Sequence, residues 1–575
     1  MTYPPPPISV EKGATRILTF WNVVAALLVL GFLVFLAEAS RGVEQTLAEL
    51  RATPVSLDPT NLPNYAARTS LRMLAAMLVS LLFTFTYATW AAKSRRAEVL
   101  LIPLLDILQS VPILGFLSVT VVFFMSLAPG KVLGAEFAAI FAIFTSQAWN
   151  MAFSFYQSLR TVPEELAEAS RGFGLSGWMR FWRLEVPFAM PPLVWNMMVS
   201  MSGGWFFVVA SEAISVGDTT VTLPGIGSYI ALAIEQRDLG AVGWAILAML
   251  IVILIYDQVL FRPLVAWADH FRFEQEAGVA PPHSWVLTML RRSWLGNLLE
   301  GLLGRALRWS FLAVPKIHNS GRSMKQDSRW IDLAWYTAAA TIAALAFWRV
   351  ATFISAGVSI SDLKDAVLSG LVTMARVFVL IAIASAIWVP VGVWIGLRPG
   401  MAGIAQPIAQ FLAAFPANLL FPIVVSAIVA LRLNPDIWLS PLMILGTQWY
   451  ILFNVVAGAS TLPSELRNVG TNLRVQGWLW WRKIALPAIA PFYVTGAITA
   501  SGGSWNASIV AEVASWGNTH LEAKGLGAYI ACATEAGDYH RIVLGIVVMS
   551  GFVIIINRAF WRPLYQYAER KFKLS

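Results

Sequence analysis

Charged residues are scarce in this chain of 575 amino acids: 13% are Asp, Glu, Lys or Arg, against 58% hydrophobic residues. A soluble globular protein has about 25% charged residues, so a water-soluble surface of this size could not be built from so few. The shortage excludes a soluble multidomain enzyme and a disordered chain, and it leaves a polytopic membrane protein. At about 20 residues per span, the apolar runs have room for roughly a dozen helices.

Cysteine and catalytic motifs are also lacking. The single cysteine, Cys532, cannot form an internal disulfide, so the redox compartment cannot be inferred from it. The sequence has no phosphate-binding G-x-x-x-x-G-K-[ST] loop, no H-E-x-x-H pattern and no G-x-S-x-G elbow, and its five histidines show no ligand spacing. We therefore expect no catalytic residue, cofactor or metal in this chain, and any ATP and Mg would belong to a partner.

Apolar runs are abundant. Lipid requires each to be a helix, because backbone groups must be satisfied internally. They lie at about 17–37, 70–92, 99–127, 133–157, 188–211, 243–261, 331–355, 367–396, 403–430, 438–459, 488–511 and 541–560. The first run is long enough to span and lacks a signal-peptide cleavage site. The predicted fold is an all-α polytopic membrane protein with about 12 transmembrane helices.

Basic residues are concentrated in alternate loops and in the tail, whereas the loops 38–68 and 212–242 are mixed or acidic. The positive-inside rule then places both termini in the cytoplasm. The same rule explains the net charge of +9. Nucleic acid is not an expected partner, since no basic groove interleaved with aromatic residues is present.

The chain repeats itself. Thr161–Leu166 recurs as Thr461–Leu466, and the same offset of 300 maps Glu212 to Glu512. Earlier in each half the offset is 304, which maps Arg72 to Arg376. Each half thus carries six spans in the same order and orientation, a parallel duplication. The predicted domains are a first unit over 1–263, a cytoplasmic linker over 264–330 and a second unit over 331–575. Within the linker, Trp285–Phe311 could be an amphipathic helix on the inner leaflet or a solvated helix.

The loop after the fourth span, Arg160 to Pro187, is unusually long. Val162-Pro163 and the following acidic residues, including Glu165, suit the start of a helix. Leu166, Ala169 and Phe173 share one face, and Gly174 ends the helix. A short amphipathic helix of this kind is suited to docking in a groove on a soluble partner.

Glu168-Ala169-Ser170, then Gly174, and finally Leu184 and Val186-Pro187 resemble the EAA loop of the membrane permeases of binding-protein-dependent type I ABC importers. In that family the loop forms a coupling helix that seats in the ATPase subunit. The second copy departs from the pattern: Asn468-Val469-Gly470 replaces EAA, and Arg474 replaces the glycine. Glu465, Leu466, Val469 and Leu473 keep the docking surface. We expect both copies to bind an ATPase with unequal contacts; decay of the second into a structural loop is the alternative.

A second match lies in the loops after Glu212 and Glu512. Each glutamate is followed by a glycine turn, Gly225-Ile226-Gly227 and Gly525-Leu526-Gly527, which resembles the nitrate/taurine/sulfonate/bicarbonate branch of these permeases. The resemblance implies a fused permease that moves a small solute, an anion such as nitrate, a sulfonate or bicarbonate. It implies two ATPase subunits inside and a periplasmic or lipid-anchored solute-binding protein outside.

Polar and aromatic residues of the spans are candidates for a translocation path or gate. Glu212 and Glu512 could act at a gate or helix end, or could contact substrate. Arg72 and Arg376 could attract an anion, pair with acidic residues or snorkel to the interface. The remaining candidates are Gln147, Trp149, Gln448 and Trp449. A secondary transporter or channel without an ATPase is the alternative function, but it would favour charged residues at mid-span, and the predicted spans are nearly free of them.

Overall fold

The structure is a computed structural model of the chain. It describes residue 46, residues 54–216, 219–271 and 284–293, short stretches within 298–311, and residues 329–572 except six positions between 463 and 471. The predicted first span, 17–37, and much of the predicted linker lie outside the described residues.

In the first repeat, helices are joined by short turns and one small hairpin. Its elements are η1 (Pro59–Asn61), α3 (Leu62–Lys93), α4 (Arg95–Ser110), α5 (Ile113–Leu127), α6 (Val132–Arg160), α7 (Glu164–Gly172), α8 (Gly177–Arg180), η2 (Phe181–Glu185), α9 (Val186–Glu212), β1 (Ala213–Val216), β2 (Thr219–Thr222), α10 (Ile226–Glu235), α11 (Leu239–Ile255), η3 (Tyr256–Phe261), α12 (Arg262–Ala268) and η4 (Asp269–Phe271). Helix α13 (Trp285–Arg292) follows and packs against α12, with Val286 and Met289 buried.

The elements of the second repeat follow a similar order, but the counterpart of α6 is divided and a short helix, η5 (Ala417–Leu420), is added. They are α15 (Arg329–Gly357), α16 (Ile360–Gly396), α17 (Pro399–Ala414), η5 (Ala417–Leu420), α18 (Phe421–Ala430), α19 (Pro435–Trp438), α20 (Leu442–Leu445), α21 (Gln448–Ser460), α23 (Gly477–Trp480), η6 (Trp481–Ala485), α24 (Leu486–Ala511), β3 (Val513–Trp516), β4 (Thr519–Glu522), α25 (Leu526–Glu535), α26 (Tyr539–Ile556), η7 (Asn557–Trp561) and α27 (Arg562–Phe572).

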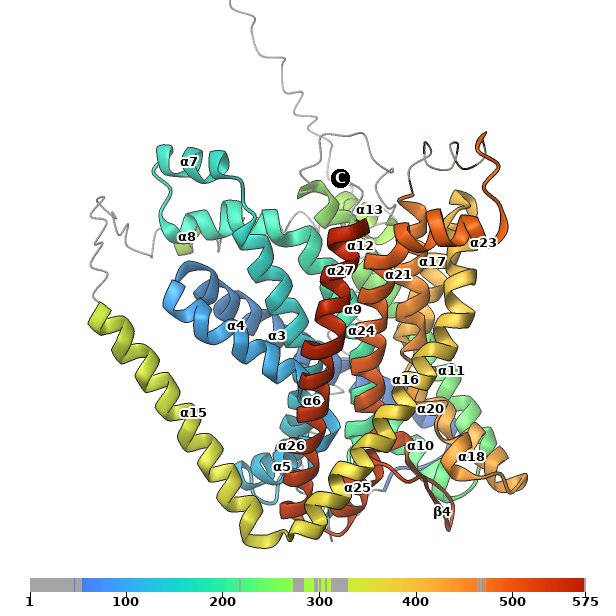
Figure 1. Ribbon diagram of the computed structural model, residues 1–575. Helices are drawn as coiled ribbons and strands as arrows, with labels where there is room; N and C mark the ends of the chain where they lie inside the picture. Colours follow the sequence, from blue (N-terminus) through green and yellow to red (C-terminus); the bar gives the residue numbers. More distant parts are fainter. Residues whose placement is uncertain are drawn as a thin grey trace, which may run out of the picture.

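The described residues contain eight helices long and apolar enough to cross a membrane, or up to eleven if each of three bent pairs counts as one span. These eleven correspond to the predicted spans other than 17–37. The prediction of an all-α polytopic membrane protein is confirmed. Helices α3, α6, α9, α16, α24 and α26 run between two opposite faces of the molecule (Figure 1). We call these the α7 face, which carries α7, α8 and α23, and the hairpin face, which carries α10, α25 and the hairpins.

Three predicted spans are not straight helices. The predicted spans 99–127 and 403–430 are bent by more than 40°, between α4 and α5 and between α17 and α18. Each bend lies at an X-Pro pair: Val111 and Phe415 are extended, as steric clash with the ring of Pro112 or Pro416 requires. The third, 438–459, is divided into α19, α20 and α21, bent by 44°. The corresponding α6 of the first repeat is continuous.

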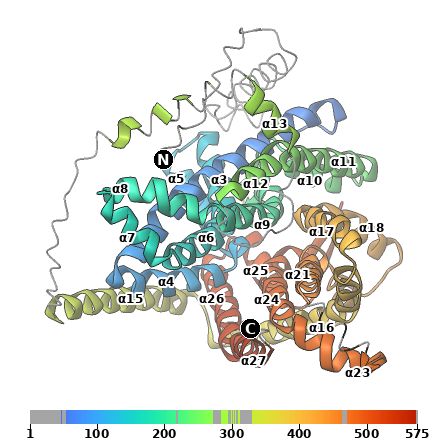
Figure 2. The ribbon, with the colours of Figure 1, turned by 90° about the horizontal axis from the view of Figure 1, so that it is seen from above.

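The two repeats exchange short elements. Residues Ile113, Leu114 and Leu117 of α5 belong to a buried apolar cluster made mostly by the second repeat. In return, Leu419 of η5 is fully buried in the apolar cluster of the first repeat. Since each repeat completes the core of the other, the two form one interlocked body. Figure 2 shows the two repeats side by side from above.

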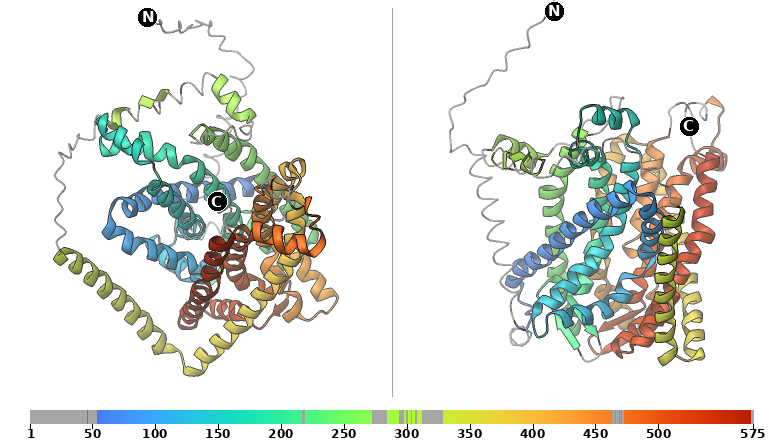
Figure 3. Two further views of the ribbon diagram at one scale, coloured as in Figure 1. Left: turned by 45° about the horizontal axis from the view of Figure 1, so that its top comes forward. Right: turned by 90° about the vertical axis from the view of Figure 1, so that its left-hand side faces the viewer.

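Helix α15, the first span of the second repeat, lies at the edge of this body, as Figure 3 shows. It contacts α26 of its own repeat and α4 of the first. Asp332 forms an ion pair with Arg96, and the Trp335 indole N–H donates to the Arg96 carbonyl at 3.2 Å. None of its apolar window is buried, so the rest of α15 is free to face lipid.

A two-stranded antiparallel hairpin follows α9 and α24 in turn. Strand β1 pairs with β2 (Ala213 opposite Thr222), and β3 pairs with β4 (Val513 opposite Glu522). Gly517 in the second turn has φ +57°, a left-handed value that a tight hairpin requires and glycine adopts readily. The hairpins place the Gly-x-Gly turns beside the ends of α9 and α24.

Candidate functional site

A cavity of about 400 Å³ lies between the two repeats. Its polar lining consists of hydroxyl, amide and carboxamide groups from both: Gln109, Thr145, Ser146, Asn150, Ser202, Thr447, Tyr450, Thr499, Ser501, Asn506 and Asn557. Among the described lining residues, Asp106 is the one charged side chain. Neutral groups can exchange hydrogen bonds with a small polar solute without holding it as tightly as an opposite charge would.

The paired glycines of α9 and α24 differ in their surroundings: Gly203, Gly502 and Gly503 line the cavity, whereas Gly204 and Gly503 lie in close contact with a neighbouring helix. Around Gly203 and Gly502 a side chain would meet open space or, at 3.9 Å, the Tyr450 hydroxyl. A Cβ on Gly204 would lie 2.9 Å from Gln147 Nε2, and one on Gly503 would overlap Thr447. Close helix packing therefore accounts for Gly204 and Gly503, whereas Gly203 and Gly502 leave room at the cavity.

The polar candidates of the fourth spans do not act together. Trp149 lines the cavity, whereas Gln147 is fully buried beside it. The Gln147 side chain accepts from Ser80 at 3.3 Å and its Nε2 lies 3.1 Å from the Met73 sulfur, so it joins α6 to α3.

In the second repeat, Gln448 accepts from the Trp388 indole N–H at 2.9 Å, and Trp449 packs on Trp388 with ring centroids 4.9 Å apart. Neither belongs to the cavity lining. Of these four candidates, the structure therefore places only Trp149 at the cavity.

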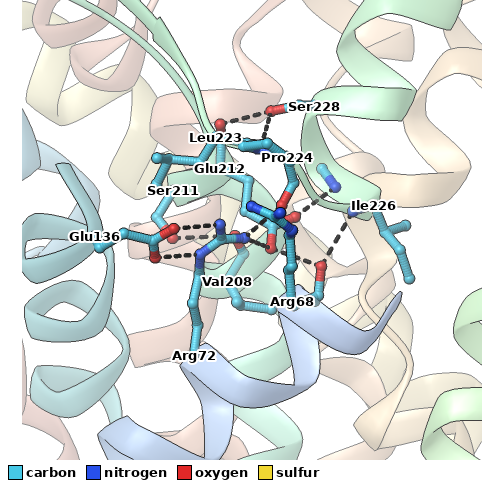
Figure 4. Close-up of polar contacts among 12 residues, drawn as sticks. Arg68, Arg72, Glu136, Val208, Ser211, Glu212, Leu223, Pro224, Ile226 and Ser228 are labelled. Carbon is cyan, nitrogen blue, oxygen red and sulfur yellow. Dashed lines mark hydrogen bonds and ion pairs between the residues drawn. The ribbon is translucent and has the colours of Figure 1, made fainter. Parts of the chain in front are cut away.

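Arg72 and Glu212 meet in a buried cluster at the hairpin face (Figure 4). The Arg72 guanidinium donates to both oxygens of Glu136, at 2.6 and 2.7 Å, and to Glu212 at 2.6 Å. Only 3% of Arg72 is exposed, so it pairs with acidic residues and does not snorkel to the interface. The Glu212 carboxylate also accepts hydrogen bonds from Thr69 Oγ1 at 2.6 Å and from the Gly227 N–H at 2.7 Å.

The cluster fixes the end of α9 against the start of α10. Glu212 is the last residue of α9, and the N–H group it binds belongs to the first turn of α10, where a negative charge is favoured. A Cβ on Gly225 would overlap the Glu212 carboxylate, and one on Gly227 would overlap the Val209 carbonyl. Glycine is therefore needed at both positions, because the turn packs directly against the Glu212 carboxylate and the Val209 carbonyl.

The second repeat has the same cluster in looser form. Glu512 accepts from Thr373 at 2.8 Å, from the Ala528 N–H at 3.1 Å and from Arg376 at 3.2 Å. Arg376 also pairs with Asp436 at 3.0 Å, but the Asp436 side chain is 53% exposed, whereas that of Glu136 is 10% exposed.

Sequence reasoning missed both second acids. Glu136 lies within a predicted span and Asp436 just before one, and the offset of 300 relates them. That offset, applied to every acidic residue, could have found them.

On the α7 face, α7 has the form that the sequence predicts. The helix ends at Gly172, and Gly174 has φ +63°, as a left-handed terminator requires. Glu165, Glu168 and Ala169 are exposed, Leu166 is half-buried, and Phe173 is 83% exposed. A large apolar side chain thus stands uncovered beside a charged helix.

In the second copy Glu465 and Asn468 are exposed and Leu473 is 71% exposed. Leu466 and Val469 lie outside the described residues. Arg474, which replaces the glycine, has φ +50°, so the chain keeps the left-handed turn without the residue that favours it.

The duplicated helices and the interlocked cores define a polytopic all-α membrane protein. A family profile matches the chain twice, over residues 84–262 and 354–573, and the chain belongs to that family, the inner membrane components of binding-protein-dependent transport systems. The double match confirms the duplication.

Curated relatives include the bicarbonate transport system permease protein CmpB of Synechococcus elongatus, 29% identical over 177 residues, which are 31% of this chain and 60% of the relative. The nitrate import permease protein NrtB of Leptolyngbya laminosa is 26% identical over 185 residues (32% and 63%). The glycine betaine/carnitine transport permease protein GbuB of Listeria monocytogenes is 28% identical over 187 residues (32% and 61%). The matches thus span about three fifths of each relative's length.

Proposed function

We propose that the chain is the complete transmembrane part of an ATP-driven importer, a fused permease in which the two repeats take the place of two separate subunits. The single observation that carries this proposal is the cavity, whose walls come from both family-matched repeats. A path between two repeats is what alternating access by relative motion of the repeats requires.

The partners in this proposal are two ABC ATPase subunits on the α7 face and a solute-binding protein on the hairpin face. The uncovered Phe173 and the exposed Glu165 and Glu168 support the first of these, because an apolar knob flanked by charge is a helix-in-groove anchor. ATP and Mg would be bound by the ATPases. The α7 face and both termini would then be cytoplasmic, in a bacterial inner membrane, with lipid around the spans. The units are drawn as 1–263 and 331–575, with 264–330 as the linker.

The proposed substrate is a small anion, as the names of the bicarbonate and nitrate relatives suggest. Glycine betaine is the second candidate, because relatives named for its transport match with similar identity and no cation is among the described cavity-lining residues. A secondary transporter would need charges that titrate or bind ions at mid-span. The buried charges at the hairpin face are paired with one another, which favours a structural role for them.

Proteoliposomes holding the purified chain with its ATPases and binding protein would test the function. We expect ATP-dependent uptake of labelled bicarbonate or nitrate. Uptake of labelled betaine instead would reassign the substrate. Uptake that persists without ATP and without the ATPases would contradict an ATP-driven importer.

Ser501→Trp tests whether the cavity is the path of the solute, because the indole would fill the cavity from α24. It should abolish uptake. Thr495→Trp, on an exposed face of the same helix and outside the lining, should not.

A further inference from the structure

One ion pair joins the two repeats at the cavity. Asp106, on α4 of the first repeat, is the charged residue of the lining, and it pairs with Arg562, the first residue of α27 in the second. Trp561 and Asn557, in the η7 turn just before Arg562, also line the cavity. Both charged side chains are partly exposed, so the pair lies at the edge of the cavity and not in a dry core.

The first repeat shows what an arginine at this position does when it has an acid within its own repeat. Arg262 corresponds to Arg562, and it pairs with Asp257 at 3.1 Å. The two residues are five apart in the π-helical turn η3, where the Arg262 N–H bonds to the Asp257 carbonyl. A π turn aligns residues i and i+5, which brings these two side chains together.

The second repeat has the same backbone turn without the acid. In η7 the Arg562 N–H bonds to the Asn557 carbonyl, the same i to i+5 bond, but residue 557 is a neutral amide. An amide cannot balance a guanidinium charge, whereas the carboxylate of Asp106 across the boundary can.

The opposite boundary lacks the matching acid. With the offset of 304 that relates α4 to α17, Asp106 corresponds to Gln410. The two exchanges, Asp257 for Asn557 and Asp106 for Gln410, therefore go together: one arginine pairs within its repeat, and the other pairs across.

We propose that Asp106 and Arg562 form a latch that closes one edge of the cavity between the repeats and that opens when the repeats move apart, while the Asp257–Arg262 pair moves as part of its own repeat. The latch also sets the charge of the cavity, because Arg562 neutralises the carboxylate in the lining. This role rests on the proposed function only in treating the cavity as the path of the solute.

Labelling of a cavity cysteine tests the latch without any transport. The reporter is Ser146→Cys, a near-isosteric change in the lining, in the full chain with Cys532→Ser, held in lipid nanodiscs. Its reaction rates are measured with a cationic trimethylammonium-ethyl and an anionic sulfonato-ethyl methanethiosulfonate. The product of the two rates reports access, and their ratio reports the charge of the cavity.

Neutralising one partner at a time should change the ratio in opposite directions. Arg562→Gln removes the guanidinium charge but keeps the Asp106 carboxylate, and it should raise the cation-to-anion ratio about tenfold, since a cleft of one sign concentrates counter-ions. Asp106→Asn should lower it by a similar factor, and the double variant should return it to the starting value. In all three variants the product of the two rates should rise about threefold, because the closed form of the cavity is less populated. A ratio unchanged within twofold in both single variants would overturn the proposal.

Asn557→Asp keeps both latch residues and offers Arg562 the local partner that Arg262 has. It should raise the combined rate as much as Arg562→Gln does. The matched control, Asp257→Asn in the first repeat, should leave the rates unchanged. If Asp257→Asn opens the cavity as much as Asn557→Asp, there is no latch specific to Asp106 and Arg562. None of these rates depends on an ATPase, so they remain readable if the importer assignment fails.

Discussion

In the first repeat the Arg72 cluster is closed: the guanidinium is 3% exposed and holds two carboxylates, Glu136 and Glu212. In the second repeat Arg376 holds Glu512 at 3.2 Å and an Asp436 that is half open to the surface. Both clusters tie the end of a long helix to the turn that follows it. The difference shows that a duplicated site can keep its geometry while its burial, and therefore its energetic importance, diverges.

The largest effect is expected when the arginine of each cluster is replaced. Arg72→Met would leave Glu136 and Glu212 buried and unpaired and should cost about 3–5 kcal/mol in the free energy of unfolding. Arg376→Met should cost less, about 2–3 kcal/mol, because it leaves one buried carboxylate, Glu512, without its counter-charge, whereas water already reaches Asp436. Denaturant titration in detergent measures both. Equal losses would mean that the two clusters contribute equally to the free energy of unfolding despite their different burial.

The paired glycines give a second, smaller contrast within each helix. Gly204→Ala and Gly503→Ala push a methyl group into Gln147 and Thr447, and each should cost about 1–3 kcal/mol. Their neighbours Gly203→Ala and Gly502→Ala face the cavity, and their effect on stability should stay within ~0.5 kcal/mol. Thermal unfolding of the four variants provides the check. A loss at Gly203 or Gly502 as large as at its neighbour would place that glycine in a helix contact.

The coupling loops can be compared through ATPase binding. Glu168→Lys reverses an exposed charge in α7 and should weaken co-purification of the ATPase about tenfold. Asn468→Lys, at the corresponding position of the second copy, should weaken it about twofold, because no acid is lost there. Leu473→Ser and Phe173→Ser serve as further probes, since both side chains are exposed. Full ATPase binding by Glu168→Lys would refute the assignment of α7.

The smallest contrast concerns Trp178 and Trp478, the second residues of α8 and α23. Trp178 stacks on Phe181 at 6.2 Å and donates to Ser310 of the linker at 3.2 Å, whereas Trp478 is 73% exposed. Trp178→Ala should cost about 1 kcal/mol and Trp478→Ala close to nothing. Protease sensitivity of the linker, measured in both variants, should rise only for Trp178→Ala. If the linker is cut equally fast in both variants, the Trp178–Ser310 contact does not hold this segment.

The sequence by itself determined the membrane fold, the duplication, the α7 turn and the turns after Glu212 and Glu512. Hydropathy identifies spans because lipid leaves a backbone no partner but itself, and that constraint is local. The left-handed turn at Gly174 and the short helix before it were predictable for the same reason: caps and turn glycines act within a few residues. The Glu212 and Glu512 turns were found because each glutamate is followed by its Gly-x-Gly turn within 15 residues, although their arginine partners were assigned only as candidates.

Tertiary structure alone decided which side chains meet. The pairing of Arg72 with Glu136 spans 64 residues, and that of Arg562 with Asp106 spans 456, so no local pattern could reveal either. Helix rotation placed Trp149 at the cavity and Gln147, two residues before it, in the packing with α3. The exchange of α5 and η5 between the repeats was likewise invisible, because which of two equivalent cores an apolar segment joins depends on the direction of the bend at Pro112 and Pro416. Burial, which separates the strong Arg72 cluster from the weak Arg376 cluster, is a property of the assembled body and not of either repeat.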